Sequence, residues 1–113
     1  MQDENMENYQ LNPFEKRVFD KLLDGNGDVI KILRNQYLAS YKFTKKSSSA
    51  GFFITIHLPE NCDESLAQFT IKQNFCFGDV MAKDPKSNQE LGFLLWIKDG
   101  YINFLEGYTY GID

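Results

Sequence analysis

The pattern of apolar and polar positions divides the chain into a helical beginning and a β-rich remainder. The first apolar stripe recurs every three or four positions, as on one face of a helix, at Phe14, Val18, Phe19, Leu22 and Leu23. The segment NPFE predicts the start of this helix, because Asn12 can cap it, Pro13 suits its first turn and Glu15 can bond back to the cap. A first helix is therefore expected directly after Asn12.

A second, shorter helix is expected after the segment DGNGD. Gly25 is predicted to take the left-handed conformation that ends a helix, and Asp28 is predicted to cap the next one. An apolar stripe through Ile32 and Leu33 then indicates a helix that ends near Gln36.

From Tyr37 onward apolar and polar residues alternate, which predicts strands. The expected strands cover residues 37–43, 52–58, 67–82, 91–98 and 101–110. Residues 45–51 are interpreted as a turn or loop, and Gly78 as a bulge or bend within the third strand. The pair Asp99-Gly100 is the strongest hairpin signal in the chain, since both types tolerate the left-handed backbone of a tight turn.

The last hairpin decides where one carboxylate, Glu106, is expected to lie. A two-residue turn pairs Lys98 with Tyr101 and, counted outward without interruption, Phe93 with Glu106. Directly paired residues share a face of the sheet. Glu106 is therefore predicted on the more apolar, core-side face, which also holds Leu95, Ile97, Ile102 and Phe104. The opposite face receives Leu94, Trp96 and Leu105.

Helices followed by strands with short connections predict an α+β fold. We expect two N-terminal helices packed on a curved antiparallel sheet of about five strands. Residues 1–11 are predicted to be a flexible polar arm, and residues 12–113 to form a single α+β domain.

Composition narrows the class of protein. The net charge of -4 argues against nucleic-acid binding, which needs clustered Lys and Arg, and the one basic cluster, at residues 42–46, is short. No apolar run reaches the about 18 residues that a membrane span needs. The beginning of the chain lacks the basic and apolar regions of a secretory signal, so a cytoplasmic location without membrane attachment is expected.

The residue types that bind metals or attack substrates are sparse. His57 is the single histidine, and Cys62 and Cys76 lack the spacing of zinc ligands. Residues 24–35 resemble a calcium loop at their first three ligand positions but have Val29 and Asn35 where glycine and glutamate are required. We expect no metal and no cofactor.

Glu106 is the main candidate for a functional residue, and three roles stay open for it. It can be a structural anchor, a contact for a ligand or partner, or a general acid or base, since burial without a partner would raise its pKa. Asp79 is the second catalytic candidate, if it approaches Glu106 across neighbouring strands. The candidate binding residues are Glu106 itself, Tyr108 and Tyr110 in the same phase, and Trp96.

Three segments carry a resemblance: AGFFITIHLPE, FCFGDVMA and LGFLLWIKDGYINFLEGYTYG. Together they resemble a family of small bacterial proteins without an assigned activity, over roughly residues 12–111. The positions that carry the motifs are Gly51, Phe52, Phe53, Gly78, Asp79, Gly92, Phe93, Gly100, Leu105, Glu106, Gly107, Tyr108 and Tyr110. The resemblance implies no enzyme class. Small acidic domains of this kind are similar in size and build to immunity proteins that neutralise toxins.

These observations lead to three hypotheses. The first is a cytosolic bacterial protein-binding module without enzymatic activity, of which an immunity-like protein is one form, and whose acidic charge favours a basic protein partner. The alternative is a small-ligand-binding protein or weak enzyme that uses Glu106 in a pocket. The third is a homodimer formed through the apolar residues predicted on the second face of the sheet.

Overall fold

The computed structural model describes residues 8–60, 74–83, 85–86 and 88–109, and it has the predicted α+β architecture. The two helices are α1 (Pro13–Leu22) and α2 (Asp28–Ala39). The strands are β1 (Lys42–Ser48), β2 (Gly51–His57), β3 (Phe75–Lys83), β4 (Glu90–Lys98) and β5 (Tyr101–Thr109). Part of the third predicted strand, residues 67–73, lies outside the described residues.

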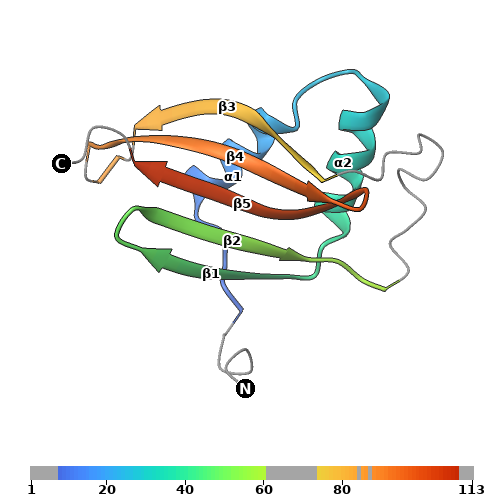
Figure 1. The fold of residues 1–113 in the computed structure, drawn as a ribbon, viewed down its shortest axis with the longest axis horizontal. Coiled ribbons are helices and arrows are strands. Elements are labelled where there is room, and N and C mark those ends of the chain that lie inside the picture. The colour runs from blue at the N-terminus through green and yellow to red at the C-terminus, as the bar shows by residue number, and fades with distance from the viewer. Residues whose placement is uncertain (1–7, 61–73, 84, 87, 110–113) are drawn as a thin grey trace.

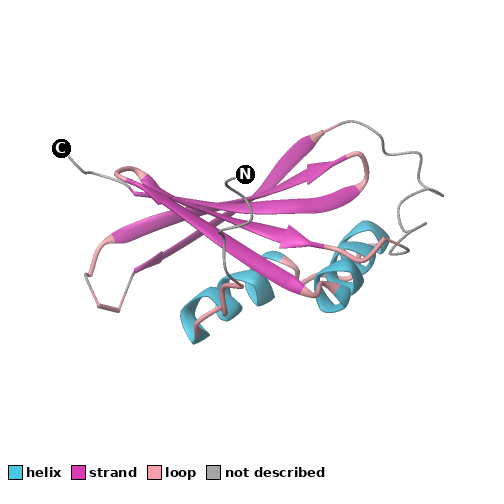
Figure 2. Cartoon of the chain, turned by 90° about the horizontal axis from the view of Figure 1, so that it is seen from below, coloured by secondary structure: helices cyan, strands magenta, loops and turns pink. Residues whose placement is uncertain are grey.

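All pairings between neighbouring strands are antiparallel, in the order β1-β2-β5-β4-β3. Both helices lie against one face of this curved sheet, and no described helix covers the other face (Figures 1 and 2). The core fills the space between the layers with fully buried side chains, among them Phe19, Leu33, Ile54, Phe93, Leu95 and Leu105. We call the face that no described helix covers the open face.

The start of α1 follows the prediction. Glu15 N–H donates to Asn12 Oδ1 over 2.7 Å, and Asn12 N–H donates to Glu15 Oε1 over 3.0 Å. The reciprocal bonds satisfy two backbone donors that a helix start would otherwise leave without a partner. Pro13 occupies the first turn, as expected.

The connection between the helices corrects two predictions. Gly25 does not have the left-handed conformation, and α2 is preceded by Gly27 rather than capped by the side chain of Asp28. Arg34 explains the difference, because its guanidinium donates to the carbonyls of Leu23, at 2.8 and 3.0 Å, and of Gly25, at 2.8 Å. A side chain from the second helix thus satisfies carbonyls at the end of the first.

The boundary between α2 and β1 also differs from the prediction, since the helix continues to Ala39 and the strand begins only at Lys42. Tyr37 belongs to the helix, where its ring stacks on Phe19 with 4.6 Å between ring centroids. Gln36 is only 2% exposed. Its side chain bonds with Gly100 O and Ile102 N–H, over 3.1 and 2.8 Å. These contacts with distant residues extend the helix beyond the end that its apolar stripe suggests.

The predicted loop at residues 45–51 is mostly strand. β1 continues to Ser48, and only Ser49 and Ala50 form the turn into β2. Within β1, Lys45 lies on the core side, since its partner Ile54 is fully buried.

The Asp99-Gly100 turn forms as predicted, with φ of 54° and 87° at its two residues. It pairs Ile97 with Ile102, but the next pair is Trp96 with Phe104, so Asn103 is an extra residue in β5. A bulge of one residue exchanges the two faces for everything beyond it.

The bulge overturns the predicted position of Glu106. Leu94, not Phe93, is the partner of Glu106, which therefore lies on the open face. Leu105, predicted on that face, is fully buried in the core instead. By the same shift Phe104 leaves the core side. The other predicted irregularity, at Gly78, is confirmed by a register shift between Phe77 and Val80.

The end of the predicted polar arm lies against the sheet. Tyr9 N–H donates to Phe43 O over 2.7 Å, and the side chains of Tyr9 and Leu11 pack against the core. Residues 1–7 of the arm lie outside the described residues. In the part of the chain that the structure describes, no helix has the length and apolarity needed to cross a membrane.

Candidate functional site

Two of the predicted binding residues meet on the open face. Trp96 Nε1 donates a hydrogen bond to Glu106 Oε1 over 2.9 Å, between the neighbouring strands β4 and β5. Both side chains are half-buried. The carboxylate of Glu106 therefore lies at the sheet surface with an indole donor, rather than in the apolar core.

Three aromatic rings form a row across the open face, which we call the aromatic row: Phe53 on β2, Phe104 on β5 and Trp96 on β4. Phe53 and Phe104 meet edge to face with 5.5 Å between centroids, and Trp96 stacks on Phe104 at 5.8 Å. Phe53 is 40% exposed, which is high for so large an apolar side chain. The row crosses three adjacent strands without cover from either helix.

A cavity of about 430 Å³ lies beside the aromatic row, over β1 and β2. We call it the sheet-face cavity; it is lined by Lys42, Thr44, Lys46, Phe53, Thr55, His57 and Phe104. Cross-strand pairing arranges six of these residues in three rungs, Lys42 with His57, Thr44 with Thr55 and Lys46 with Phe53. The two lysines thus stand at the ends of a threonine-lined floor.

His57 is part of the cavity wall and bonds to its floor. Its Nε2 lies 3.1 Å from Thr44 Oγ1. Burial, and secondly the positive charge of Lys42, lower the pKa of His57 below its usual value of 6.5. The imidazole is therefore mostly neutral at pH 7, and the fixed charges of the cavity are those of the lysines.

The other predicted site residues are Tyr108, Asp79 and Tyr110. Tyr108 lies on the open face with its ring over Gly92, where a Cβ atom would come within 2.5 Å of the ring. A side chain at this position would therefore require the Tyr108 ring to move. Asp79 lies in β3, and β4 separates that strand from Glu106, so the expected approach across neighbouring strands is wrong. Tyr110 lies outside the described residues.

Glu15 carries a buried carboxylate, since this residue is only 2% exposed. Besides its bond to the Asn12 N–H, it accepts the Tyr9 hydroxyl at 2.8 and 2.9 Å and pairs with Lys45 Nζ at 2.8 Å. The ammonium of Lys45 also lies 4.4 Å from the ring centroid of Phe52. The capping motif predicted only one of these contacts, and the others join segments distant in sequence.

This cluster changes the acid–base properties of its members. Burial alone would lower the pKa of Lys45, but the hydrogen bonds and charge interactions with Glu15 and Tyr9 together raise it by more, so that the pKa lies above its usual 10.5. Burial is also the main reason why the pKa of Tyr9 is raised above 10.0, with Lys45 acting against the shift. Lys45 and Tyr9 thus keep their protons at neutral pH.

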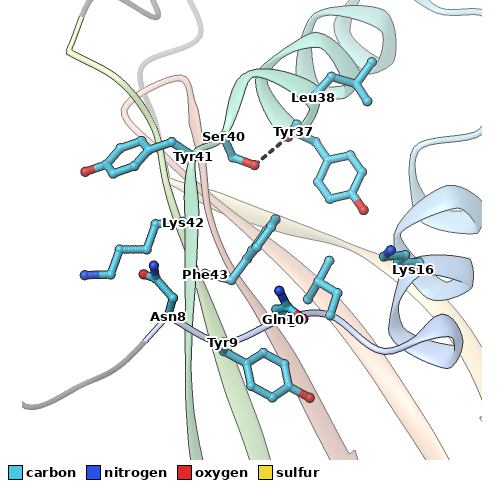
Figure 3. A pocket seen from close by; sticks show the side chains of 11 residues that line it. Asn8, Tyr9, Gln10, Lys16, Tyr37, Leu38, Ser40, Tyr41, Lys42 and Phe43 are labelled. Carbon is cyan, nitrogen blue, oxygen red and sulfur yellow. Dashed lines mark hydrogen bonds between the residues drawn. The ribbon is translucent and has the colours of Figure 1, made fainter.

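Two further cavities lie on the helix side. One of about 390 Å³ borders the Glu15 cluster near Phe14 and Arg17. The other, of about 560 Å³, lies between the segment that holds Tyr9 and the end of α2 (Figure 3). Leu38, which is 71% exposed, and Tyr41, at 67%, stand on its far side from Tyr9 (Figure 3).

Comparisons with protein-family models, curated proteins and solved structures give no match for this chain. The bacterial family that the three sequence segments resemble therefore stays a prediction.

Proposed function

We propose that this protein is a non-enzymatic protein-binding module and that its partner docks on the open face of the sheet. The observation that carries the proposal is the aromatic row on the face opposite the two helices. Within the row, Phe53 is 40% exposed. Met81 on β3 lies on the same face, since its partner in β4 is Gly92, and it adds apolar surface with an exposure of 48%. Aromatic side chains held rigidly at a surface are the residues that contribute most to protein–protein affinity.

The alternative of a small-ligand site or weak enzyme built on Glu106 has less support. Glu106 is half-buried, accepts the indole N–H, and is not among the residues that line the sheet-face cavity. This arrangement favours a role in holding Trp96 within the docking surface. The resemblance to small bacterial proteins favours an immunity-like module in a bacterial cytoplasm as the biological form of the proposal.

The charge of the partner is better argued from the open face than from the whole chain. The net charge of -4 favours a basic protein at long range. Exposed acidic residues, however, occur in the helical region, at Asp20, Asp24 and Asp28. The cavity beside the aromatic row has lysines instead. Contact at this cavity therefore favours acidic groups of the partner.

Site-specific photo-crosslinking tests the proposal. A photoreactive phenylalanine derivative replaces Phe53 in one variant and Asp20, on α1, in the control, and both are irradiated in host cells. We expect a heterologous protein adduct from position 53 only. Adducts that are the same at both positions, or their absence at position 53, would contradict the proposal. An adduct with a second copy of the chain would instead support the homodimer.

A further inference from the structure

We infer that the sheet-face cavity receives an acidic side chain of the protein partner, while an aromatic or aliphatic neighbour of that side chain packs on the aromatic row. The inference rests on the proposed function and specifies the chemistry of the partner segment. It depends on the arrangement of charge, polar floor and rings on the open face.

The charge of the cavity is of one sign. Lys42 and Lys46 stand four residues apart on the same face of β1, which places their backbones about 13 Å apart along the strand. Within the described part of the chain neither has an ion-pair partner, and no carboxylate lines the cavity. A carboxylate held between them would meet both ammonium groups at a partly desolvated site.

The floor of the cavity supplies hydrogen bonds. Thr44 is only 5% exposed, and Thr55 lies directly opposite it. Hydroxyl groups can donate to a carboxylate oxygen after rotation of their hydrogen. The Nε2 of His57 lies 3.1 Å from the Thr44 hydroxyl, and in the tautomer that carries its proton on Nε2 the imidazole donates to Thr44 and leaves the threonine hydrogen free for a carboxylate.

The rings next to the cavity determine which type of residue the partner should have beside its acidic side chain. Phe53 and Phe104 line the cavity, and Trp96 extends the apolar surface beyond it. A lone small anion would leave most of this surface in water. A protein segment with an acidic residue beside an apolar one covers both parts.

A single-stranded nucleic acid is the competing occupant, because bases also stack on exposed rings of a sheet. The rings of Phe104 and Trp96 already stack on each other, with an angle of 18° between their planes, and this contact uses ring faces that bases would need. The net charge of -4 also opposes a polyanion. The observations therefore favour a protein segment, in which the acidic contact is local.

Panning of a random peptide library on the immobilised protein tests the inference without knowledge of the partner. We expect enriched peptides with Asp or Glu next to aromatic or aliphatic residues. In calorimetric titrations the charge reversal Lys42→Glu/Lys46→Glu should weaken these peptides by about tenfold or more. The matched control Lys16→Glu/Lys31→Glu makes the same charge change on the helices and should weaken them by less than about twofold.

Each outcome separates the inference from the proposed function. Enrichment of basic peptides, or equal weakening by both charge reversals, would overturn the inference while leaving the binding module in place. Binding of a single-stranded oligothymidine that the cavity variant abolishes would overturn it in favour of nucleic acid. If no peptide is enriched, the inference is wrong, and the proposed function fails as well if the crosslink at position 53 is also absent.

Discussion

Lys45 and Glu15 join the two layers of the fold: the ammonium of Lys45 on β1 lies 2.8 Å from a carboxylate oxygen of Glu15 on α1. The carboxylate is almost completely buried, at 2% exposure, and Tyr9 and the N–H of Asn12 complete its hydrogen bonds. An ion pair in such a place is costly to break from one side, because the remaining charge stays poorly solvated.

Glu15→Gln should therefore destabilise the protein by about 2–4 kcal/mol. Glutamine keeps the size of the side chain but leaves the Lys45 ammonium without its counter-charge. The measurement is the free energy of unfolding in urea. Glu106→Gln is the matched control, and it should cost less than about 1 kcal/mol, because Glu106 is half-buried and glutamine can still accept a bond from Trp96. Equal losses in the two variants would contradict this account.

The bond between Trp96 and Glu106 can be followed by fluorescence, since Trp96 is the single tryptophan of the chain. Glu106→Ala removes the acceptor of the indole N–H and should change the emission spectrum of the folded protein. Glu106→Gln retains an acceptor oxygen and should give a spectrum closer to the wild type. An unchanged spectrum in the alanine variant would show that the indole does not depend on Glu106.

The bulge at Asn103 is tested by deleting that residue. Because Asn103 is the extra residue, its removal lets the pairs Ile97 with Ile102 and Trp96 with Phe104 follow each other in a continuous ladder, with Leu105 still in the core and Glu106 still on the open face. We therefore expect the deletion to cost less than about 2 kcal/mol, measured by thermal unfolding followed by circular dichroism. If β5 instead paired without a bulge, the deletion would exchange its two faces and turn Leu105 out of the core. A loss of about 4 kcal/mol or more would therefore count against the bulge.

Alkaline pH should weaken the fold. Burial raises the pKa of Tyr9 and of Tyr37 above 10.0, and the contacts of Lys45 raise its pKa above 10.5 in spite of burial. All three groups hold their protons more tightly in the folded state than in the unfolded one. Their stabilising effect is therefore complete below about pH 10 and is lost as the pH rises through the folded-state pKa values.

Urea unfolding at a series of pH values from neutral to alkaline measures this effect. The Tyr9→Phe/Tyr37→Phe variant lacks both phenols and should show a smaller decrease above pH 10.0 than the wild type. Identical slopes in the two proteins would place the alkaline transition elsewhere, for example in the Lys45 ion pair alone.

Local signals in the sequence predicted the features that depend on few neighbouring residues. The capping box at Asn12 and the turn at Asp99-Gly100 formed as expected, since each is satisfied within one turn of chain. The order of helices and strands then gave the α+β class. These interactions need no knowledge of distant contacts.

The errors arose where distant contacts decide the structure. Arg34, rather than a left-handed Gly25, satisfies the carbonyls after α1, and Gln36 extends α2 by binding the final hairpin. No glycine or proline marks the bulge at Asn103, so the pattern beyond the hairpin fits either register until the core is assembled. The predicted position of Glu106 depended on that one residue.

The bond from Tyr9 N–H to Phe43 O has a consequence for strand pairing between molecules. β1 is an edge strand, and exposed edges invite pairing with another chain. The N–H of Tyr9 donates a hydrogen bond to one outward carbonyl of that edge. The Tyr9 hydroxyl in turn donates to Glu15 and accepts from Lys45. Tyr9 thus covers part of the sheet edge, and a truncation that removes it would leave the Phe43 carbonyl of β1 available for strand pairing between molecules.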